Sequence, residues 1–288
     1  MRVLVLDHTY PLQDIQAILP AAEFATMDDA GPDVEALLVS PDAPVRAADL
    51  DRLPGLKVIA TASTGTDHID LEAAEARGVA VHNVAGYCTE EVADHALALL
   101  VAGRRGLFQQ DRSVQAGEWD HLAAGMPHRL EGTLVAVIGW GRIGRRFGEK
   151  AAALGMHVRW WDPLVEGSEP DLEDLLRWAD AVSLHAPWTP ETEGMIDRRR
   201  LEMMRPGTLL INTARGALVD REALLEAGHV RALFDNVWER PPEADLLGVH
   251  HIAITPYVAW LSPETELLPY TLAAQAAADT LGRSGAVS

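Results

Sequence analysis

The feature that most constrains the fold of this chain is a glycine-rich turn near its middle. Residues 139–144 read Gly-Trp-Gly-Arg-Ile-Gly, directly after an apolar run at residues 134–138 and at the start of a helical stretch over residues 142–154. In such a unit one glycine makes a tight turn, the next lets the backbone approach a pyrophosphate, and the third lets the helix pack on the strand. A glycine turn in an unrelated α/β protein is the alternative, but this order of elements predicts a dinucleotide site.

An acidic residue supports this interpretation and indicates which dinucleotide is bound. The next expected strand, residues 158–161, is followed by Asp162, 18 residues after Gly144. A carboxylate near this spacing binds the adenosine ribose of NAD, and it repels the 2′-phosphate of NADP. Pro163 comes next, with no arginine immediately after it. The sequence therefore predicts NAD as the cofactor.

Short apolar runs alternate with helical stretches along the whole chain. Nearly continuous apolar strands separated by helices are typical of parallel sheets that are covered on both faces. Two such sets in 288 residues predict an α/β protein with two doubly wound units. The expected strands are residues 3–6, 36–39, 57–60 and 79–81 in the first set, and residues 134–138, 158–161, 181–184, 208–211, 229–233 and 251–254 in the second.

The best-marked helix is expected over residues 89–104. Thr89 is a favourable N-cap residue, the acidic residues after it suit the positive end of the helix dipole, and an apolar stripe follows at helical period. Residues 106–132 are expected to connect the two units. The alanine-rich residues 263–281 are expected to form a helix that crosses back to pack on the first unit.

The charge balance and cysteine content exclude several classes of protein. The chain has 43 acidic and 24 basic residues, and its net charge of −19 repels a nucleic-acid backbone. Cys88 is the only cysteine, so no internal disulfide can form. The apolar runs are too short for a membrane span or a secretory signal. We therefore expect a cytoplasmic protein that binds neither nucleic acid nor membrane and that uses no metal.

A second motif follows the expected strand at residues 208–211. Residues 212–220 read Asn-Thr-Ala-Arg-Gly-Ala-Leu-Val-Asp, and open α/β sheets bind ligands at the carboxyl ends of their strands. Arg215 offers a planar fork that fits a carboxylate. The alternative is a helix-capping loop in which Arg215 pairs with a structural acid. The first interpretation predicts a small-molecule carboxylate as the ligand.

Together with further motifs, these features give the chain a resemblance to the D-isomer-specific 2-hydroxyacid dehydrogenase family over nearly its full length. The similarity extends to phosphoglycerate dehydrogenases, and the Gly-Thr-Asp-His of residues 65–68 is similar to the form found in erythronate-4-phosphate dehydrogenases. The motifs in family order are residues 63–70, 89–105, 114–120, 139–144, 161–163, 183–187 and 206–220.

The resemblance implies a Rossmann NAD-binding domain at residues 98–264, inserted into a flavodoxin-like substrate domain at residues 1–97 plus 265–288. It implies hydride transfer between NAD and a small 2-hydroxy or 2-keto acid. Arg215 and the backbone amides of Ser63, Thr64 and Gly65 would hold the substrate carboxylate. The residues implied to bind the cofactor are Gly139, Gly141, Arg142, Ile143 and Gly144 at the pyrophosphate, Asp162 at the ribose, His185, Ala186, Pro187, Thr213 and Ala214 along the site, and Asp235 near the nicotinamide carboxamide.

The chain departs from the family at the acid/base residues. Where the family has a catalytic histidine, residues 255–257 read Thr-Pro-Tyr, so Tyr257 stands in its place. The family's glutamate position falls on Arg240, with Glu239 as its neighbour. A free tyrosine titrates near pH ~10 and a free histidine near ~6.5, so a tyrosine is a poor base but a usable proton donor at neutral pH. A cation such as Arg240 beside the phenol would favour its ionised form.

Two functions of different classes remain open. The first is an NAD-dependent oxidoreductase with Arg215 and Tyr257 as catalytic residues. The second is a catalytically silent relative that binds a dinucleotide or another ligand and has a sensing or assembly role. His250 and His251 could replace the missing histidine or form a solvated surface pair. The resemblance also implies a homodimer through the nucleotide domain, with residues 106–132 contributing.

Overall fold

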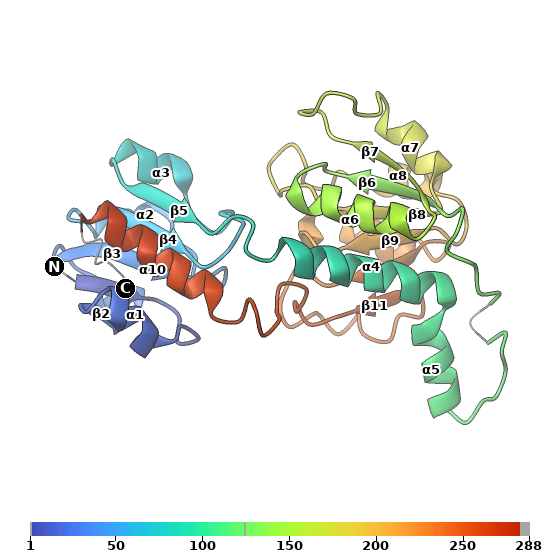
Figure 1. The fold of residues 1–288 in the computed structure, drawn as a ribbon, viewed down its shortest axis with the longest axis horizontal. Coiled ribbons are helices and arrows are strands. Elements are labelled where there is room, and N and C mark those ends of the chain that lie inside the picture. The colour runs from blue at the N-terminus through green and yellow to red at the C-terminus, as the bar shows by residue number, and fades with distance from the viewer. Residues whose placement is uncertain (1, 124, 283–288) are drawn as a thin grey trace. The chain divides into compact units, whose positions relative to one another are not determined.

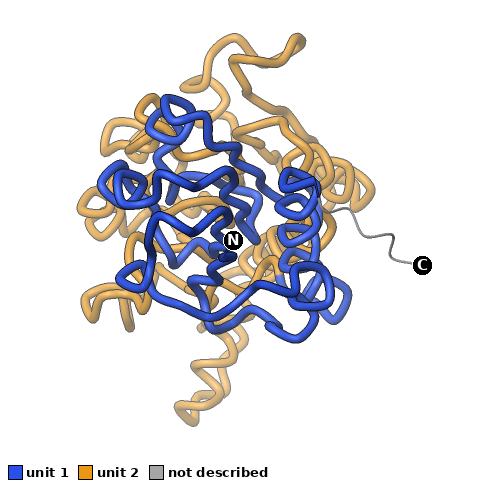
Figure 2. Tube along the Cα trace, turned by 90° about the vertical axis from the view of Figure 1, so that its left-hand side faces the viewer, with its two compact units in different colours: residues 1–87, 261–288 blue, residues 88–260 orange. Residues whose placement is uncertain are grey.

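The computed structural model describes residues 2–123 and 125–282. The chain divides into two compact units (Figure 2), which are described separately below. Unit 1 contains the residues up to Tyr87 and those from Leu261 onward, and unit 2 contains residues 88–260. The two ends of the chain therefore build one unit and its middle builds the other, so the insertion of one domain into the other is confirmed.

Unit 1 is a five-stranded parallel sheet with helices on both faces (Figure 1). Its strand order, β2-β1-β3-β4-β5, is the flavodoxin-like order. Val3 and Val5 pack on the face covered by α1 and α10, whereas Leu4 packs on the other face, as the alternation of a strand requires. The elements are β1 (Arg2–Val5), α1 (Leu12–Ile18), β2 (Ala22–Phe24), a 3₁₀ turn (Met27–Asp29), β3 (Val34–Val39), α2 (Ala47–Asp51), β4 (Val58–Thr61), α3 (Leu71–Ala76), β5 (Ala80–Asn83) and α10 (Leu268–Thr280).

Unit 2 is a six-stranded parallel sheet of order β11-β10-β9-β8-β6-β7. Helices α4 and α6 cover one face, and α7 and α8 cover the other (Figure 1). Helix α9 packs on the same face as α7 and α8. The elements are α4 (Thr89–Arg105), α5 (Leu107–Gln115), β6 (Leu134–Ile138), α6 (Arg142–Ala153), β7 (His157–Trp161), α7 (Leu172–Trp178), β8 (Ala181–Leu184), α8 (Arg198–Met203), β9 (Leu209–Asn212), a 3₁₀ turn (Gly216–Leu218), α9 (Arg221–Glu226), β10 (Arg231–Phe234) and β11 (Ile252–Ile254).

These two sheets confirm the predicted fold class of two doubly wound parallel units. The helix expected near the C-terminus is also present, because α10 buries Ala273, Ala274 and Ala277 in unit 1. Small alanine side chains let this helix lie close to the sheet, which anchors the last part of the chain to the unit that contains the first.

The boundaries between the units differ from the expected ones. The boundary expected after residue 97 falls inside α4, whose Ala96, Leu99 and Leu100 are buried in unit 2 with strands β6 and β9. Residues 106–132 do not connect the units, because they lie wholly within unit 2 and begin with the helix α5. The chain passes between the units at residues 87–88 and 260–261 instead, ten and four residues before the expected positions.

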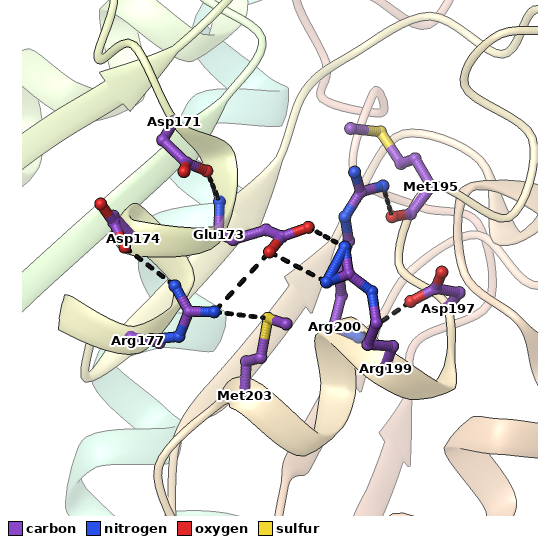
Figure 3. A network of polar contacts seen from close by, with 9 residues as sticks. All are labelled: Asp171, Glu173, Asp174, Arg177, Met195, Asp197, Arg199, Arg200 and Met203. Carbon is purple, nitrogen blue, oxygen red and sulfur yellow. Dashed lines mark hydrogen bonds and ion pairs between the residues drawn. The ribbon is translucent and has the colours of Figure 1, made fainter.

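Several charged side chains of unit 2 are satisfied locally, as the contact between α7 and α8 illustrates (Figure 3). Glu173 of α7 accepts both guanidinium branches of Arg199 from α8, and Arg177 donates to Asp174 at 2.8 Å. Arg200 donates to the carbonyl of Met195 at 2.6 Å. The Glu173–Arg199 pair joins α7 to α8 on one face of the sheet, whereas the other two contacts lie within α7 and between α8 and the residues before it.

Candidate cofactor and substrate site

The sequence-predicted site residues of unit 2 gather along one edge of its sheet. Each follows the carboxyl end of a strand: Gly139 after β6, Asp162 after β7, His185 after β8, Thr213 to Arg215 after β9, Asp235 after β10 and Tyr257 after β11. Consecutive strands β6 and β7 are neighbours on one side, whereas β8 lies on the other side of β6. The strand order thus reverses at β6, which is where open α/β sheets bind ligands.

The three glycines of the 139–144 motif have different surroundings. Gly139 has a φ of 93°, and a Cβ there would lie 2.6 Å from the backbone nitrogen of Ala186. A Cβ on Gly144 would lie 2.0 Å from the carbonyl oxygen of Gly139. A Cβ on Gly141 would meet nothing within 4 Å. The chain itself therefore requires the first and third glycines, whereas the middle one leaves open space.

The start of α6 presents free hydrogen-bond donors beside this space. The N–H groups of Gly141, Arg142 and Ile143 have no hydrogen-bond partner among the described residues, and no side chain caps the helix. Unpaired N–H groups and the helix dipole favour a negatively charged ligand. Open space and free donors at the same turn fit the pyrophosphate of a dinucleotide.

Asp162 lies at the end of β7 and is tied to the glycine turn. Its carboxylate accepts a hydrogen bond from the backbone of Trp140 at 2.8 Å and another from the backbone of Leu164 at 3.0 Å. The ring of Trp140 stacks on Trp160, with centroids 5.0 Å apart. A carboxylate has about four lone-pair sites, so two can still accept hydrogen bonds from ligand hydroxyls.

His185, which follows β8, is held as a neutral ring. Its Nε2 lies 2.9 Å from the hydroxyl of Ser183, and its ring packs on Phe147 with centroids 5.1 Å apart. Burial lowers the pKa of His185 to about 3. The ring therefore carries no charge at neutral pH. Ala186 contacts the first glycine through its backbone, and the carbonyl of Pro187 accepts from Thr192 at 2.7 Å.

The loop after β9 is fixed by its own polar groups. Asn212 donates to the carbonyl of Arg215 at 2.8 Å and accepts from the N–H of Ala214 at 3.0 Å. The guanidinium of Arg215 donates to the carbonyl of Ala214 at 3.0 Å. Thr213 is 9% exposed, and its hydroxyl has no hydrogen-bond partner among the described residues. A buried hydroxyl without a partner is costly, so this position also fits a bound polar ligand.

Asp235 organises the turn that carries Tyr257. Its buried carboxylate accepts hydrogen bonds from the Thr255 hydroxyl at 2.6 Å and from the backbone N–H groups of Val258 and Ala259, both at 2.9 Å. Its own carbonyl accepts from the N–H of Tyr257 at 3.0 Å. These contacts give Asp235 a clear structural role, which was not expected from the sequence.

His95 is a further residue at this turn that the sequence reasoning missed. It projects from α4, and its Nε2 lies 2.9 Å from the Thr255 hydroxyl and 3.6 Å from the Asp235 carboxylate. The available signal was a histidine on the apolar face of this helix, three residues after the buried Val92. His95 links α4 to the carboxyl end of β11.

Tyr257 has an unusual backbone and a cationic neighbour. Its φ of 56° is the only positive value at a non-glycine residue in the described parts of the chain. The guanidinium carbon of Arg240 lies 4.3 Å from the centroid of its ring, within the range of cation–π contacts. The pairing of Arg240 with Tyr257 expected from the sequence is therefore present. Glu239 is exposed beside it.

The two histidines considered as replacements lie elsewhere. His250 and His251 precede β11, at the amino edge of the sheet and away from Tyr257. His250 is exposed, but His251 is buried, with its Nε2 3.1 Å from the carbonyl of Leu224. The expectation of a solvated pair is wrong for His251, because its ring fills a space beside α9.

The remaining predicted residues belong to unit 1, in the loop after β4. Ser63 donates through its hydroxyl to the carbonyl of Gly65 at 2.7 Å, and Asn83 donates to the carbonyl of Thr64. The backbone N–H groups of Ser63, Thr64 and Gly65 have no hydrogen-bond partner among the described residues. Successive free N–H groups form a concavity that favours anions, which fits the expected carboxylate.

Across residues 2–123 and 125–282, no group of three or more metal-ligating side chains gathers, and no helix is long and apolar enough to cross a membrane.

Comparisons with known proteins agree with this geometry. Residues 97–259 match the model of the D-isomer specific 2-hydroxyacid dehydrogenase, NAD binding domain. The chain is similar to the glycerate dehydrogenase of Methylorubrum extorquens, with 39% identity over 237 residues, which cover 77% of this chain and 74% of that one. It is 38% identical over 250 residues to the D-3-phosphoglycerate dehydrogenase of Mycobacterium leprae, which cover 82% of this chain and 47% of that one.

A solved structure supports the likeness over the full chain. The TT0316 protein from Thermus thermophilus matches with a TM-score of 0.87 and 33% identity, and the match covers 98% of this chain and 97% of that one. The chain spans about half the length of the phosphoglycerate dehydrogenases that it matches. The matched region of the family model includes every predicted site residue of unit 2.

Proposed function

This chain belongs to the D-isomer specific 2-hydroxyacid dehydrogenase family, and on this premise we propose that it reduces a small 2-keto acid with NADH, using Tyr257 as the proton donor. The observation that carries the proposal is the contact of the Arg240 guanidinium with the ring of Tyr257, the residue that we assign to the position of the family's histidine. The reverse reaction, oxidation of the 2-hydroxy acid, uses the same groups.

The residues of unit 2 suit NAD. The free N–H groups of Gly141, Arg142 and Ile143 would hold the pyrophosphate, and the Asp162 carboxylate would accept from the ribose hydroxyls. The same carboxylate would repel a 2′-phosphate, which favours NAD over NADP. The unpaired Thr213 hydroxyl supports a further polar contact along the cofactor. When bound, NAD supplies the chemistry of hydride transfer.

Each unit offers one group that suits the carboxylate of a substrate. Arg215 offers a planar fork at the carboxyl end of β9, and the loop of Ser63, Thr64 and Gly65 in unit 1 offers free N–H groups. Relatives carry the names glycerate and phosphoglycerate dehydrogenase, and both of these named compounds are 2-hydroxy acids, which supports the same class here. Unit 1 would then be the substrate unit and unit 2 the cofactor unit.

Tyr257 would exchange the proton that accompanies the hydride. Reduction places negative charge on the carbonyl oxygen, and a neutral phenol can donate a proton to it. Oxidation needs the phenolate, which is scarce at neutral pH and which the positive charge of Arg240 would favour. The enzyme would therefore reduce keto acids faster than it oxidises hydroxy acids near pH 7.

The decisive experiment compares turnover with binding. We would measure NADH consumption with glyoxylate, pyruvate and hydroxypyruvate, and NADH binding by calorimetry on the same preparation. Turnover of any of them, faster in reduction than in oxidation, would support the proposal. Tight NADH binding without turnover on any 2-keto acid would overturn it in favour of a silent binding protein with a sensing or assembly role.

The assembly proposed here is a homodimer through unit 2. Support comes from the segment after α4: α5 has no buried residue among those described, Trp119 is 93% exposed and Met126 is 70% exposed. In Figure 1 α5 projects from the body of unit 2. Contiguous exposed apolar patches mark interaction sites, and these side chains would contribute to one. Light scattering at micromolar concentration should give twice the chain mass, and a monomer mass would contradict the proposed dimer.

The cytoplasmic location expected from the sequence stays a prediction.

A further inference from the structure

A buried histidine of unit 1, which has no part in the proposed reaction, lies behind the loop after β4. His68 is 6% exposed, and its Nε2 lies 3.0 Å from the hydroxyl of Thr61, the last residue of β4. The Thr61 hydroxyl lies 2.8 Å from that of Ser63, which donates to the carbonyl of Gly65 at 2.7 Å. All three side chains are buried. These four residues form one continuous chain of hydrogen bonds, which we call the hydroxyl relay.

The last bond of the hydroxyl relay fixes the direction of all the others. A carbonyl oxygen can only accept, so the single proton of the Ser63 hydroxyl points at Gly65. Ser63 must then accept from the Thr61 hydroxyl, and Thr61 has no second proton to offer to His68. His68 must therefore carry a proton on Nε2 and donate it to Thr61. The relay runs from the ring to the loop.

The loop that the hydroxyl relay reaches has three successive carbonyls bonded within unit 1. The carbonyl of Ser63 accepts from the N–H of Val84 at 3.0 Å, and that of Thr64 accepts from the side chain of Asn83. The relay supplies the third bond, to Gly65. Each planar trans peptide points its N–H away from its C=O. The N–H that follows each carbonyl is therefore turned away from these partners.

The N–H groups of these three peptides belong to Thr64, Gly65 and Thr66. None of them has a hydrogen-bond partner among the described residues. The Thr64 hydroxyl is also buried without a partner in the described part of the chain. Successive free N–H groups favour an anion. The direction of the last one, on Thr66, depends on the bond that the hydroxyl relay makes to the Gly65 carbonyl.

The backbone of His68 is held on the side away from its ring. Its carbonyl accepts from the N–H of Val45 at 2.9 Å, and Asp70 donates its N–H to the carbonyl of Val45 at 2.9 Å. Ile69 and Val45 thereby form a parallel bridge between the loop and the segment after β3. The ring therefore projects from a fixed backbone, as a residue that orients others requires.

We propose that His68 is a positioning residue for the substrate, because its Nε2–H directs the hydroxyl relay and so keeps the loop N–H groups available to the carboxylate of the 2-keto acid. The nature of the ligand rests on the proposed function, whereas the direction of the relay does not. Without this donor the Thr61 hydroxyl can turn to a backbone carbonyl. Ser63 would then lose its donor, and the Gly65 carbonyl would no longer be held.

The first experiment locates the proton on the ring without any substrate. Nitrogen-15 NMR of the full chain, labelled in its 11 histidines, reports which ring nitrogens carry protons. The signal of His68 is the one that disappears in His68→Gln, and we expect its Nε2 to be protonated. A His68 ring with no proton on Nε2 would overturn the proposal, whatever the enzyme turns over.

The second experiment measures the affinity for oxamate, a carboxylate that resembles a 2-keto acid, by calorimetry with saturating NADH. His68→Leu fills the space without a donor, and its oxamate affinity should fall at least about tenfold. The KM for a keto acid should rise with it, whereas kcat and NADH affinity should stay within about twofold. His68→Gln places an amide N–H near the position of Nε2, so its oxamate affinity should stay within about threefold of wild type.

His251→Leu is the matched control for damage to the fold. His251 is also buried, and its Nε2 lies 3.1 Å from a carbonyl in unit 2. Both Leu variants should melt at a lower temperature than wild type, but only His68→Leu should bind oxamate more weakly. Equal losses of oxamate affinity in the two variants, or unchanged affinity in His68→Leu, would overturn the positioning role.

Failure of the proposed function gives a different result. A wild type that binds oxamate but reduces no keto acid would contradict the proposed reduction, while weaker binding by His68→Leu would still support the positioning role. A wild type with no measurable oxamate affinity would overturn the positioning role, because the loop would then hold no carboxylate.

Discussion

The guanidinium of Arg240 lies over the aromatic ring of Tyr257, with 4.3 Å between its central carbon and the ring centroid. The two residues come from the segments that follow β10 and β11. In the proposed mechanism Tyr257 takes the place of the family's histidine, and a cation on a phenol would then replace an acid on an imidazole.

Tyr257→Phe tests the proton donor, because it removes the hydroxyl and keeps the ring under Arg240. We expect the rate of keto-acid reduction to fall about 10²-fold, within the usual range for losing a general acid. NADH affinity should stay within twofold. Tyr270→Phe, which changes a partly buried tyrosine of α10, is the control. An unchanged rate in Tyr257→Phe would show that the proton comes from water or another residue.

Arg240→Gln tests the cation. The positive charge favours the phenolate that oxidation requires, so its loss should slow oxidation more than reduction. Cation–π contacts at exposed sites are worth about 0.5–1 kcal/mol, which corresponds to a factor of about 2 to 5 in rate. The pH–rate profile of oxidation should move toward higher pH. A profile that stays in place, measured between pH 7 and 10, would contradict the role.

Asp235→Asn tests the anchor of the Tyr257 turn. The amide keeps the size but turns one acceptor into a donor that faces the N–H groups of Val258 and Ala259 or the Thr255 hydroxyl. Leaving a buried donor unpaired costs about 1–3 kcal/mol. Urea unfolding should show this loss, and the reduction rate should fall because Tyr257 is misplaced. Asp162→Asn, at the other end of the sheet, should weaken NAD binding while leaving the turn intact.

Arg215→Ala tests the substrate carboxylate contact. Losing a charge-assisted pair should cost about 2–5 kcal/mol on the substrate side, seen as a rise in KM or a loss of oxamate-type inhibition. NAD affinity should change less than about tenfold. Normal keto-acid binding by the variant would show that Arg215 is structural.

His185 predicts a pH dependence of stability. Its folded pKa is about 3, whereas an unfolded histidine titrates near ~6.5. Below pH ~6.5 the unfolded chain binds a proton that the folded chain refuses, so the free energy of unfolding falls as pH drops toward 3, by at most about 1.4 kcal/mol per pH unit. Above pH ~6.5 the residue contributes nothing.

The measurement is urea unfolding at pH 7.5, 6 and 5 for wild type and His185→Gln. The variant should lose less stability between pH 7.5 and 5 than wild type does. His157→Gln, which changes an exposed histidine, should follow wild type. Equal pH dependence in wild type and His185→Gln would show that folding does not lower the pKa of this ring.

The sequence predicted the fold well because strand identity is a local property. The apolar runs that form β6, β8 and β9 are nearly continuous. The three glycines between β6 and α6 have a spacing that is typical of a dinucleotide-binding turn. Asp162, His185 and Arg215 each follow the end of a predicted strand. Their common edge of the sheet could therefore be predicted without knowing how the side chains pack.

Some features could not be predicted from the sequence, because they depend on contacts between residues that are far apart in the chain. Nothing near Asp235 indicates that its carboxylate caps a turn more than 20 residues later, and nothing near Tyr257 indicates a positive φ. The boundary predicted after residue 97 differs from the observed one for a related reason. The apolar stripe of α4 shows that the helix is buried, but it does not show that the partner is β9 rather than a strand of unit 1.

Gly141 differs from its two neighbours in the motif because nothing in the folded chain occupies the space where its side chain would be. Its φ of −74° is also open to any residue. Folding alone would therefore allow a side chain at this position, and we attribute the glycine to the close approach of the proposed nucleotide. Replacing it with alanine separates two properties that most mutations confound: the protein should keep its melting temperature and lose its nucleotide.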